Sequence, residues 1–334
     1  MHFTPKRAGG QLIQRFIQRH VNIGGVVFTV VALVILFSVS SGGIWISAAS
    51  LTSVLHTTAL LAVLAMGQAL VICSGEIDIS VGSIFAMGAF VFLGFATKIG
   101  TLPAVLLGVT AGVLIGAFNG CLVAYMRIPS LIVTLGSLFI FRGLAYMLSE
   151  GQPFTIDTEI RGKLTFYQLF GGGQIFGTQD SVLWMLGIAL FLHLLMFFTS
   201  LGNRLLALGG DAKSALSRGV SVNAIKCFAF TTSGALAAFS GILEANKLGF
   251  ADGTFGRLIE MEAIAAAVIG GCVLSGGRIS IVGALLAAFI LSGIQSYLVI
   301  MGISPQWYLL VLALLVVGAS IGNIKFRQWV AKHR

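Results

Sequence analysis

The feature that most constrains the fold is a series of long apolar tracts separated by short polar segments. Only 9% of the 334 residues are charged, whereas a soluble domain carries roughly a quarter charged residues. About 20 apolar residues span a bilayer as a helix, in which every backbone polar group is satisfied internally. Tracts such as 104–124 and 183–198 do not alternate as barrel strands would. The sequence therefore predicts an all-α polytopic membrane protein.

We predict about ten transmembrane helices in one domain covering residues 1–334, because no linker or low-complexity stretch divides the chain. The predicted spans are 24–37, 51–73, 81–96, 102–126, 131–148, 182–200, 225–248, 263–274, 279–300 and 307–322. The eighth is short and has Gly-Gly pairs at 270–271 and 276–277, so we expect a broken or tilted helix there. The first span lacks a small-residue cleavage pattern and is expected to be retained.

Lys and Arg are distributed unevenly between alternate loops, so the net charge of +9 indicates membrane topology rather than nucleic-acid binding. With a cytoplasmic N-terminus and ten crossings, the inner basic residues are Lys6, Arg7, Arg15, Arg19, Arg127, Arg204, Lys213, Arg218, Lys226, Arg278, Lys325, Arg327, Lys332 and Arg334. The outer ones are Lys98, Arg161, Lys163, Lys247 and Arg257. We therefore predict that a basic arm (1–21), a loop (201–224) and a tail (323–334) are cytoplasmic.

Four cysteines and five histidines are scattered without CxxC or other metal-ligand spacing. They are Cys73, Cys121, Cys227, Cys272, His2, His20, His56, His193 and His333. We interpret the cysteines as small core residues, and His56 and His193 as polar packing or pathway residues within spans. No Ser–His–Asp or HExxH pattern is present. We predict no catalytic residue, no metal and no cofactor.

The fourth span carries Gly108, Gly112, Gly116 and Gly120, one glycine every four residues. On a helix these positions form a ridge without side chains, which lets a second helix approach closely. The ridge predicts helix packing within the protein. The alternative is a ridge that faces a solute path, where Asn119 would offer a polar group.

Residues 74–82 read Ser-Gly-Glu-Ile-Asp-Ile-Ser-Val-Gly and place two carboxylates between apolar spans, with no Lys or Arg nearby in sequence. An acid within the membrane is a functional candidate by default, because burying its charge is costly. Glu76, Asp78 and Ser80 are therefore pathway candidates. The alternative is a short solvated turn in which Asp78 caps the next helix.

A similar string recurs at 275–283, where Arg278 replaces Asp78. Internal repeats are common in transporters, although chance agreement is a rival explanation in a chain rich in Gly, Ile and Val. The preceding Leu274 completes an LSGGR string that resembles the signature of transport ATPases. The chain lacks a GxxxxGK[ST] phosphate-binding loop, so we reject nucleotide binding by this chain.

The predicted inner loop contains a short helix at 211–218, with Asp211 as its N-cap and Gly219 as its stop. A helix of two turns is marginal alone, so another surface must support it. Small side chains at Ala212 and Ala215 would permit a close partner, and Arg218 could pair with an acid there. The alternative is a local connector that rests on its own chain.

Together these motifs resemble the permease subunits of bacterial ATP-binding-cassette (ABC) monosaccharide importers of the ribose/xylose/galactose type. The resemblance covers nearly the whole chain after the N-terminal arm, and it rests on residues 74–82, 119–120, 123–125, 128–130, 134–136, 142–143, 202–220, 260–271 and 274–278. Three positions depart from the family pattern: Glu76 replaces a usual Gly, Asp211 a common Asn, and Ile279 a Gly. These departures leave the particular sugar open.

The resemblance implies an inner-membrane permease, and the Lys/Arg distribution predicts that both of its termini are cytoplasmic. Its implied partners are a cytoplasmic ABC ATPase, a periplasmic sugar-binding protein, and a second copy or paralogue of the permease. The implied ATPase-coupling residues are Gly209, Gly210, Asp211, Ala212, Ser214, Ala215, Arg218 and Gly219. The pathway candidates are Glu76, Asp78, Ser80, Asn119, Arg142 and Glu262. The alternatives are a permease for branched-chain amino acids or another small polar solute, and an ion-coupled secondary transporter.

Overall fold

The computed structural model describes residues 8–171, 173–175, 178–304 and 306–332. Its thirteen α-helices within those residues are α1 (Ala8–Ser40), α2 (Ala48–Cys73), α3 (Val81–Ile99), α4 (Thr101–Ala124), α5 (Ser130–Leu148), α6 (Thr158–Lys163), α7 (Asp180–Phe198), α8 (Ser200–Gly210), α9 (Ala212–Ser217), α10 (Val222–Leu248), α11 (Ile259–Ile269), α12 (Ile281–Ile300) and α13 (Gln306–Lys332). Short 3-10 turns, η1 (Ile44–Ile46) and η2 (Tyr167–Leu169), and four two-residue strands complete it.

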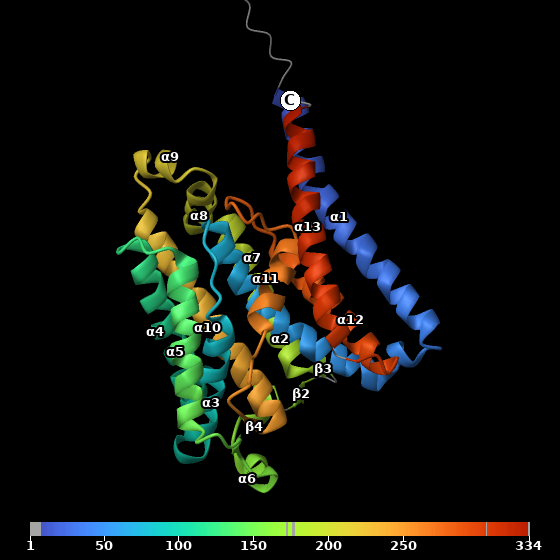
Figure 1. The fold of residues 1–334 in the computed structure, drawn as a ribbon, viewed down its shortest axis with the longest axis vertical. Helices are drawn as coiled ribbons and strands as arrows, with labels where there is room; N and C mark the ends of the chain where they lie inside the picture. Colours follow the sequence, from blue (N-terminus) through green and yellow to red (C-terminus); the bar gives the residue numbers. More distant parts are fainter. Residues whose placement is uncertain (1–7, 172, 176–177, 305, 333–334) are drawn as a thin grey trace, which may run out of the picture.

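The strands lie in two antiparallel pairs. β1 (Phe154–Thr155) pairs with β4 (Phe250–Ala251), and β2 (Gln174–Ile175) pairs with β3 (Thr178–Gln179). In Figure 1 α8 and α9 lie at one end of the molecule, which we call the α9 end, and β4 and α6 lie at the opposite end, the α6 end. The start of α1 and the end of α13 both lie at the α9 end (Figure 1).

The all-α membrane fold predicted from the sequence is confirmed. Seven helices within the described residues are long and apolar enough to cross a bilayer: α2, α3, α4, α5, α7, α10 and α12. Shorter apolar segments lie in α1 (Gly24–Ser40) and α13 (Gln306–Ala319). The remaining predicted span contains α11, whose 11 residues extend only about 16 Å at 1.5 Å per residue. The chain then continues without helix until Ile281, which is the interruption that the flanking glycines predict.

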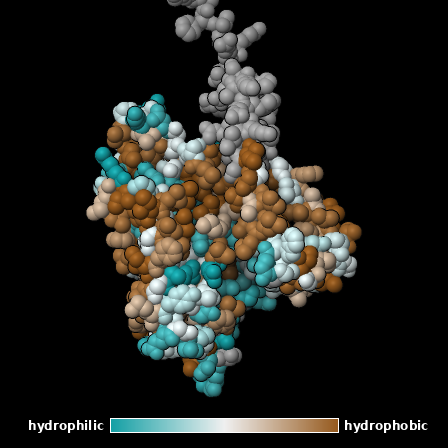
Figure 2. All heavy atoms as spheres, in the orientation of Figure 1, coloured by the Kyte–Doolittle hydropathy of each residue, from teal (hydrophilic) through white to brown (hydrophobic). Residues whose placement is uncertain are grey.

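Helix α2 lies at the centre and is buried along most of its length, in contact with α7, α10, α11 and α12. Helices α4, α5 and α7 are outer helices, with exposed side chains such as Leu114, Phe139 and Phe191. Figure 2 shows hydrophobic residues across the middle of the visible face and hydrophilic ones toward the α9 and α6 ends. This distribution matches a bilayer that surrounds the middle of the protein.

The glycine ridge of α4 lies against α10. A Cβ atom added at Gly112 would lie 2.4 Å from the carbonyl oxygen of Gly234, and one at Gly116 would lie 2.4 Å from that of Phe230. Gly108 and Gly120 face the same helix at Ile242 and Cys227. Contacts this short leave no room for side chains, so the two helix backbones meet directly. The ridge therefore faces a helix of the same chain rather than a solute path.

The two similar strings occupy comparable places in the structure. Residues 74–80 join the end of α2 to α3, and residues 270–280 join the end of α11 to α12. Gly75 (φ +85°) and Gly276 (φ +84°) both adopt the left-handed conformation that glycine permits. They are also neighbours, since a Cβ on Gly276 would lie 3.1 Å from the Gly75 nitrogen. This placement supports an internal repeat.

Candidate functional site

Asp78 lies inside the protein, so the alternative of a solvated turn is wrong. Its side chain is fully buried, and Oδ1 accepts hydrogen bonds from the backbone N–H (2.9 Å) and the hydroxyl (2.5 Å) of Ser80. Oδ2 has no hydrogen-bond partner among the described residues. The amide of Gln68 donates to the backbone carbonyl of Asp78. A buried carboxylate oxygen without a partner is costly, so Asp78 remains a candidate for the solute path.

Ser80 links Asp78 to two further helices. Asn119 of α4 donates to the Ser80 hydroxyl at 2.9 Å, and its own carbonyl oxygen accepts a hydrogen bond from Ser137 of α5 at 2.5 Å. Asn119 and Ser80 are fully buried, and Ser137 nearly so. This chain of polar groups connects the 74–80 segment to α4 and α5. Three of the predicted pathway residues, Asp78, Ser80 and Asn119, are thus brought together.

A cavity of about 440 Å³ lies beside β4 at the α6 end. It is lined by Thr57, Leu60, Leu61, Phe85, Glu244, Leu248, Phe250, Asp252, Thr254, Phe255, Gly256, Arg257, Ile259, Glu262, Ser292 and Gln295. Of the predicted pathway residues only Glu262 contributes to this lining. The rings of Phe85 and Phe255 pack with their centroids 5.2 Å apart, one turn of α3 beyond Ser80. Both rings belong to the cavity lining.

Arg142 of α5 is hydrogen-bonded to two residues that line this cavity. Its guanidinium donates to the backbone carbonyl of Phe255 and, at 3.1 Å, to that of Gly256. The buried carboxylate of Glu260 lies close enough to balance part of its charge. Arg142 is therefore placed to shape the cavity from behind the wall.

A second cavity, of about 580 Å³, lies at the α9 end. Its lining includes Glu76, Pro129, Leu216 and Lys226, and Glu76 forms an ion pair with Lys226 of α10. Glu76 thus lines a different cavity from Glu262, the pathway candidate at the α6 end. The partner Lys226 is 150 residues away in sequence, so inspection of the 74–82 string alone could not find it.

The short helix predicted at 211–218 is present as α9, with Asp211 as its N-cap. The Asp211 carboxylate accepts hydrogen bonds from the Ser214 hydroxyl (2.6 Å) and from the N–H groups of Lys213 (3.0 Å) and Ser214 (3.3 Å). These bonds, that of the Ser214 hydroxyl above all, hold the pKa of Asp211 below its usual value. After Arg218 the chain turns at Gly219, whose φ is +79°.

One expectation about α9 is wrong. Ala215 is only 3% exposed, so its side chain packs within the protomer and cannot be the close contact of a partner. The α9 side chains that face outward include Ala212, Lys213 and Leu216, and the leucine is 64% exposed. Leu216 is the large apolar side chain that α9 leaves exposed.

Helix α8 connects α9 to the protein core through a backbone contact at Gly209. A Cβ atom there would lie 1.8 Å from the carbonyl oxygen of Cys73, at the end of α2, and 2.2 Å from the nitrogen of Gly277. The Gly277 N–H also donates to that Cys73 carbonyl at 2.9 Å. The ends of α2 and α8 and the 270–280 segment therefore meet at one point. Gly210, the next residue, has open space at its Cβ position.

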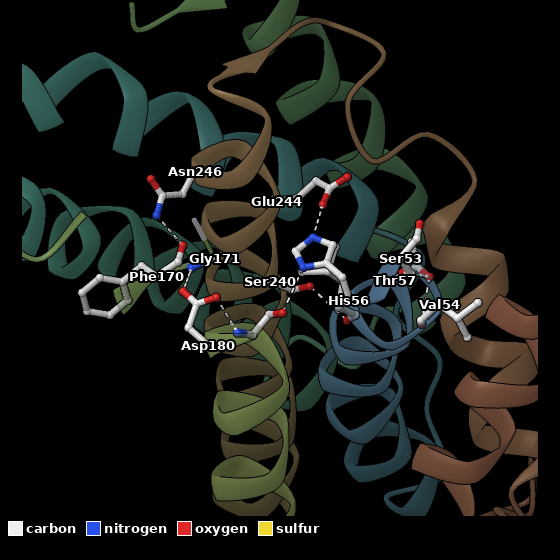
Figure 3. Close-up of polar contacts among 12 residues, drawn as sticks. Ser53, Val54, His56, Thr57, Phe170, Gly171, Asp180, Ser240, Glu244 and Asn246 are labelled. Carbon is white, nitrogen blue, oxygen red and sulfur yellow. Dashed lines mark hydrogen bonds and ion pairs between the residues drawn. The ribbon is translucent and has the colours of Figure 1, made fainter. Parts of the chain in front are cut away.

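A polar cluster at the α6 end escaped the sequence interpretation, apart from His56 itself. Figure 3 shows His56 of α2 between Glu244 of α10 and the first turn of α7. The ring nitrogens lie 2.8 Å from Glu244 Oε2 and 2.9 Å from Ser181 Oγ. Glu244 is an acid within a predicted span, and that signal could have identified it.

A family model described as the permease component of branched-chain amino acid transport systems matches residues 50–320. The chain belongs to this permease family. The match begins just inside α2 and extends into α13, so it covers the cavities, the segment around Asp78 and α9 of the permease.

Individual relatives align with most of the permease. The ribose import permease RbsC of Escherichia coli (strain K12) is 34% identical over 278 residues, which cover 83% of this chain and 86% of the relative. The autoinducer 2 import system permease LsrC of Escherichia coli O9:H4 (strain HS) is 37% identical over 268 residues, or 79% of this chain and 75% of the relative. LsrC of Yersinia pseudotuberculosis serotype IB (strain PB1/+) is 32% identical over 305 residues, which cover 86% of this chain and 81% of the relative. No solved structure matches the permease.

Proposed function

We propose that this permease is the membrane subunit of an ABC importer that translocates a monosaccharide across the bacterial inner membrane. The observation that carries the proposal is the alignment with the ribose import permease, which extends over 83% of this chain and 86% of the relative. Relatives named for autoinducer 2 import align over a similar share. The solute class is taken from these relatives rather than from the wider family description, because each of them is at least 32% identical to this chain.

The α9 end of the permease is the proposed docking site for a cytoplasmic ATPase. Two observations support this proposal. Leu216 is exposed on a helix whose start is capped by Asp211, and the same side chain lines the second cavity. The capping bonds order the α9 backbone before a partner arrives, which lowers the entropy cost of docking. Positive charge in the predicted inner loops supports a cytoplasmic position for this end and for both termini.

Gly209 offers a physical route from this docking site to the solute path. A shift of α8 must move the end of α2 or the 270–280 segment, because no side chain or gap separates them. These segments lead into α3 and α12, which carry Phe85 and Ser292 of the cavity lining. ATP binding and hydrolysis on the partner would thus shift the permease between outward-open and inward-open states by contacts that differ between the two.

At the α6 end, the 440 Å³ cavity is the proposed entry for a solute released by a periplasmic sugar-binding protein. The buried chain of Asp78, Ser80 and Asn119 lies deeper and is proposed to close the path in the present conformation. Surrounding lipid would contact the exposed side chains of α4, α5 and α7. A second copy or paralogue of the permease would complete the transporter.

The experiment is uptake by cells that lack their own ribose and autoinducer 2 importers. These cells would express the permease together with its cognate ABC ATPase and sugar-binding protein, and they would be offered labelled D-ribose, D-xylose, D-galactose and L-leucine. We expect ATP-dependent uptake of at least one sugar. Uptake of leucine alone, or uptake by the permease without the ATPase, would refute the proposal.

A further inference from the structure

We infer that Glu244 is a solute-binding carboxylate of the cavity at the α6 end and that His56 is its positioning residue. The inference rests on the proposed function, because it identifies where a polyhydroxylated solute would bind during translocation. Glu244 lines the cavity, and its Oε2 atom is hydrogen-bonded to His56 (Figure 3). Among the described residues, no hydrogen bond engages its other oxygen, Oε1.

Because a carboxylate only accepts hydrogen bonds, the contact with Glu244 sets the direction of the His56 hydrogen bonds in the neutral imidazole. When Nε2–H donates to the Glu244 carboxylate, Nδ1 carries the lone pair and accepts the Ser181 hydroxyl hydrogen. Ser181 is itself held by its backbone N–H, which donates to Asp180 Oδ1 at 2.8 Å. Asp180 also accepts from the backbone N–H of Gly171. The imidazole ring is thus anchored through α7 and aims one N–H at Glu244.

The arrangement joins a serine, a histidine and a carboxylate, yet it is the reverse of a serine hydrolase. In a hydrolase the serine faces the substrate and the acid is buried behind the histidine. Here Ser181 is fully buried and the histidine side chain is 3% exposed, while the Glu244 side chain is 24% exposed at the cavity. The group presented to a ligand is the carboxylate, so the geometry supports binding and positioning rather than nucleophilic chemistry.

The cavity chemistry points to a neutral ligand with several hydroxyl groups. Its lining contains the carboxylates of Glu244, Asp252 and Glu262 but a single basic side chain, Arg257. An anionic solute would meet excess negative charge, whereas hydroxyl groups donate to carboxylates in strong, charge-assisted bonds. The further polar lining from Ser292 and Gln295 would serve the remaining hydroxyls. Lys247, on the same face of α10, balances part of the charge of Glu244.

The test compares uptake of the transported sugar with uptake of its monodeoxy analogues in the complete transporter. One substitution, Glu244→Gln, keeps the shape of the side chain and removes its charge. We expect roughly a 10- to 100-fold lower maximal uptake rate, because a hydrogen bond to a charged group contributes about that factor. The half-saturating sugar concentration, set by the binding protein, should stay unchanged. The preference for the sugar over the analogue that lacks the bonded hydroxyl should shrink toward one.

His56→Leu should reproduce the loss of preference, and His56→Gln, which retains an N–H donor, should restore part of it. A histidine that only supports folding would change transporter amount without changing this preference. The matched control is Glu159→Gln, an acid at the same end that is 82% exposed and lies outside the cavity. It should leave both uptake and preference unchanged.

ATP hydrolysis stimulated by the binding protein, measured on the purified complex, separates the explanations. Hydrolysis within about twofold of wild type, together with lost sugar preference, supports a solute contact at Glu244. Wild-type uptake and preference in Glu244→Gln would overturn the inference while the proposed function stands. A wild-type transporter that moves none of the sugars would overturn both.

Discussion

Replacing Gly209 with alanine tests whether α8 is locked directly to the core. The new Cβ atom would lie 1.8 Å from the Cys73 carbonyl oxygen and 2.2 Å from the Gly277 nitrogen. Reaching even a tight contact of about 3.0 Å from the oxygen requires a displacement of about 1.2 Å (3.0 − 1.8). All three atoms nearest to this Cβ are backbone atoms, so no side chain can rotate away.

Overpacking of this kind typically costs about 1–3 kcal/mol. Since 1 kcal/mol shifts the Tm of a domain of 150–250 residues by roughly 2–4 °C and that of a longer chain by less, we expect the apparent Tm to fall by a few degrees. The matched control is Gly210→Ala, one residue further along α8, where the added methyl group meets nothing within 4 Å. Its Tm should stay the same or rise, because alanine favours helix over glycine by up to about 1 kcal/mol.

The measurement is the apparent Tm of each variant in the same detergent. Each variant carries a fluorescent-protein fusion, and the height of its size-exclusion peak is recorded after heating to a series of temperatures. Membrane levels of both variants would be compared at growth temperature. If Gly209→Ala and Gly210→Ala have equal Tm values, the direct contact between α8 and α2 does not exist, and the proposed route from α9 to the core fails with it.

Three further predictions follow from the site. Asp78→Asn should lower uptake by roughly fivefold, because Ser80 loses a charged acceptor and a buried amide N–H₂ gains no partner; uptake at the wild-type rate would show that the charge is dispensable. Leu216→Glu should leave membrane levels unchanged and abolish co-purification of the ATPase, since this side chain is 64% exposed; normal ATPase retention would make α9 a connector. In a background without native cysteines, Lys213→Cys should react with an impermeant maleimide only after the membrane is permeabilised, because the loop is predicted to be cytoplasmic. Labelling in intact cells would show that the predicted topology is wrong.

Local patterns in the sequence predict a large part of the fold. Apolar length alone places each predicted span on a helix, because lipid permits few other conformations of the backbone. The N-cap at Asp211 and the break after Ile269 are likewise set by neighbouring residues and by glycine. The resemblance strings also lie where the family model matches, at residues 50–320.

Two features were beyond these patterns, the rotation of a helix and the path of a connecting segment, and each decides one of the site interpretations. Ala215 has the small side chain expected of a partner contact, but α9 turns it toward the permease and presents Leu216 instead. The hydrophobicity of the short α9 could not settle this, since both residues are apolar. Asp78 similarly follows an apolar span as a surface turn would, yet the 74–80 segment runs inward and buries it.

By itself, the sequence determined the membrane class, the approximate spans and the family, because each depends on contiguous residues or on recurring strings. Only the tertiary structure decided the pairs that define the site. His56 meets Glu244 across 188 positions, and Glu76 meets Lys226 across 150. Such contacts arise when helices distant in sequence pack with one particular rotation and depth. The rotation and depth of packing depend on all the close contacts between helices together, and no single segment encodes them. The contact of Gly209 with Cys73 is one example.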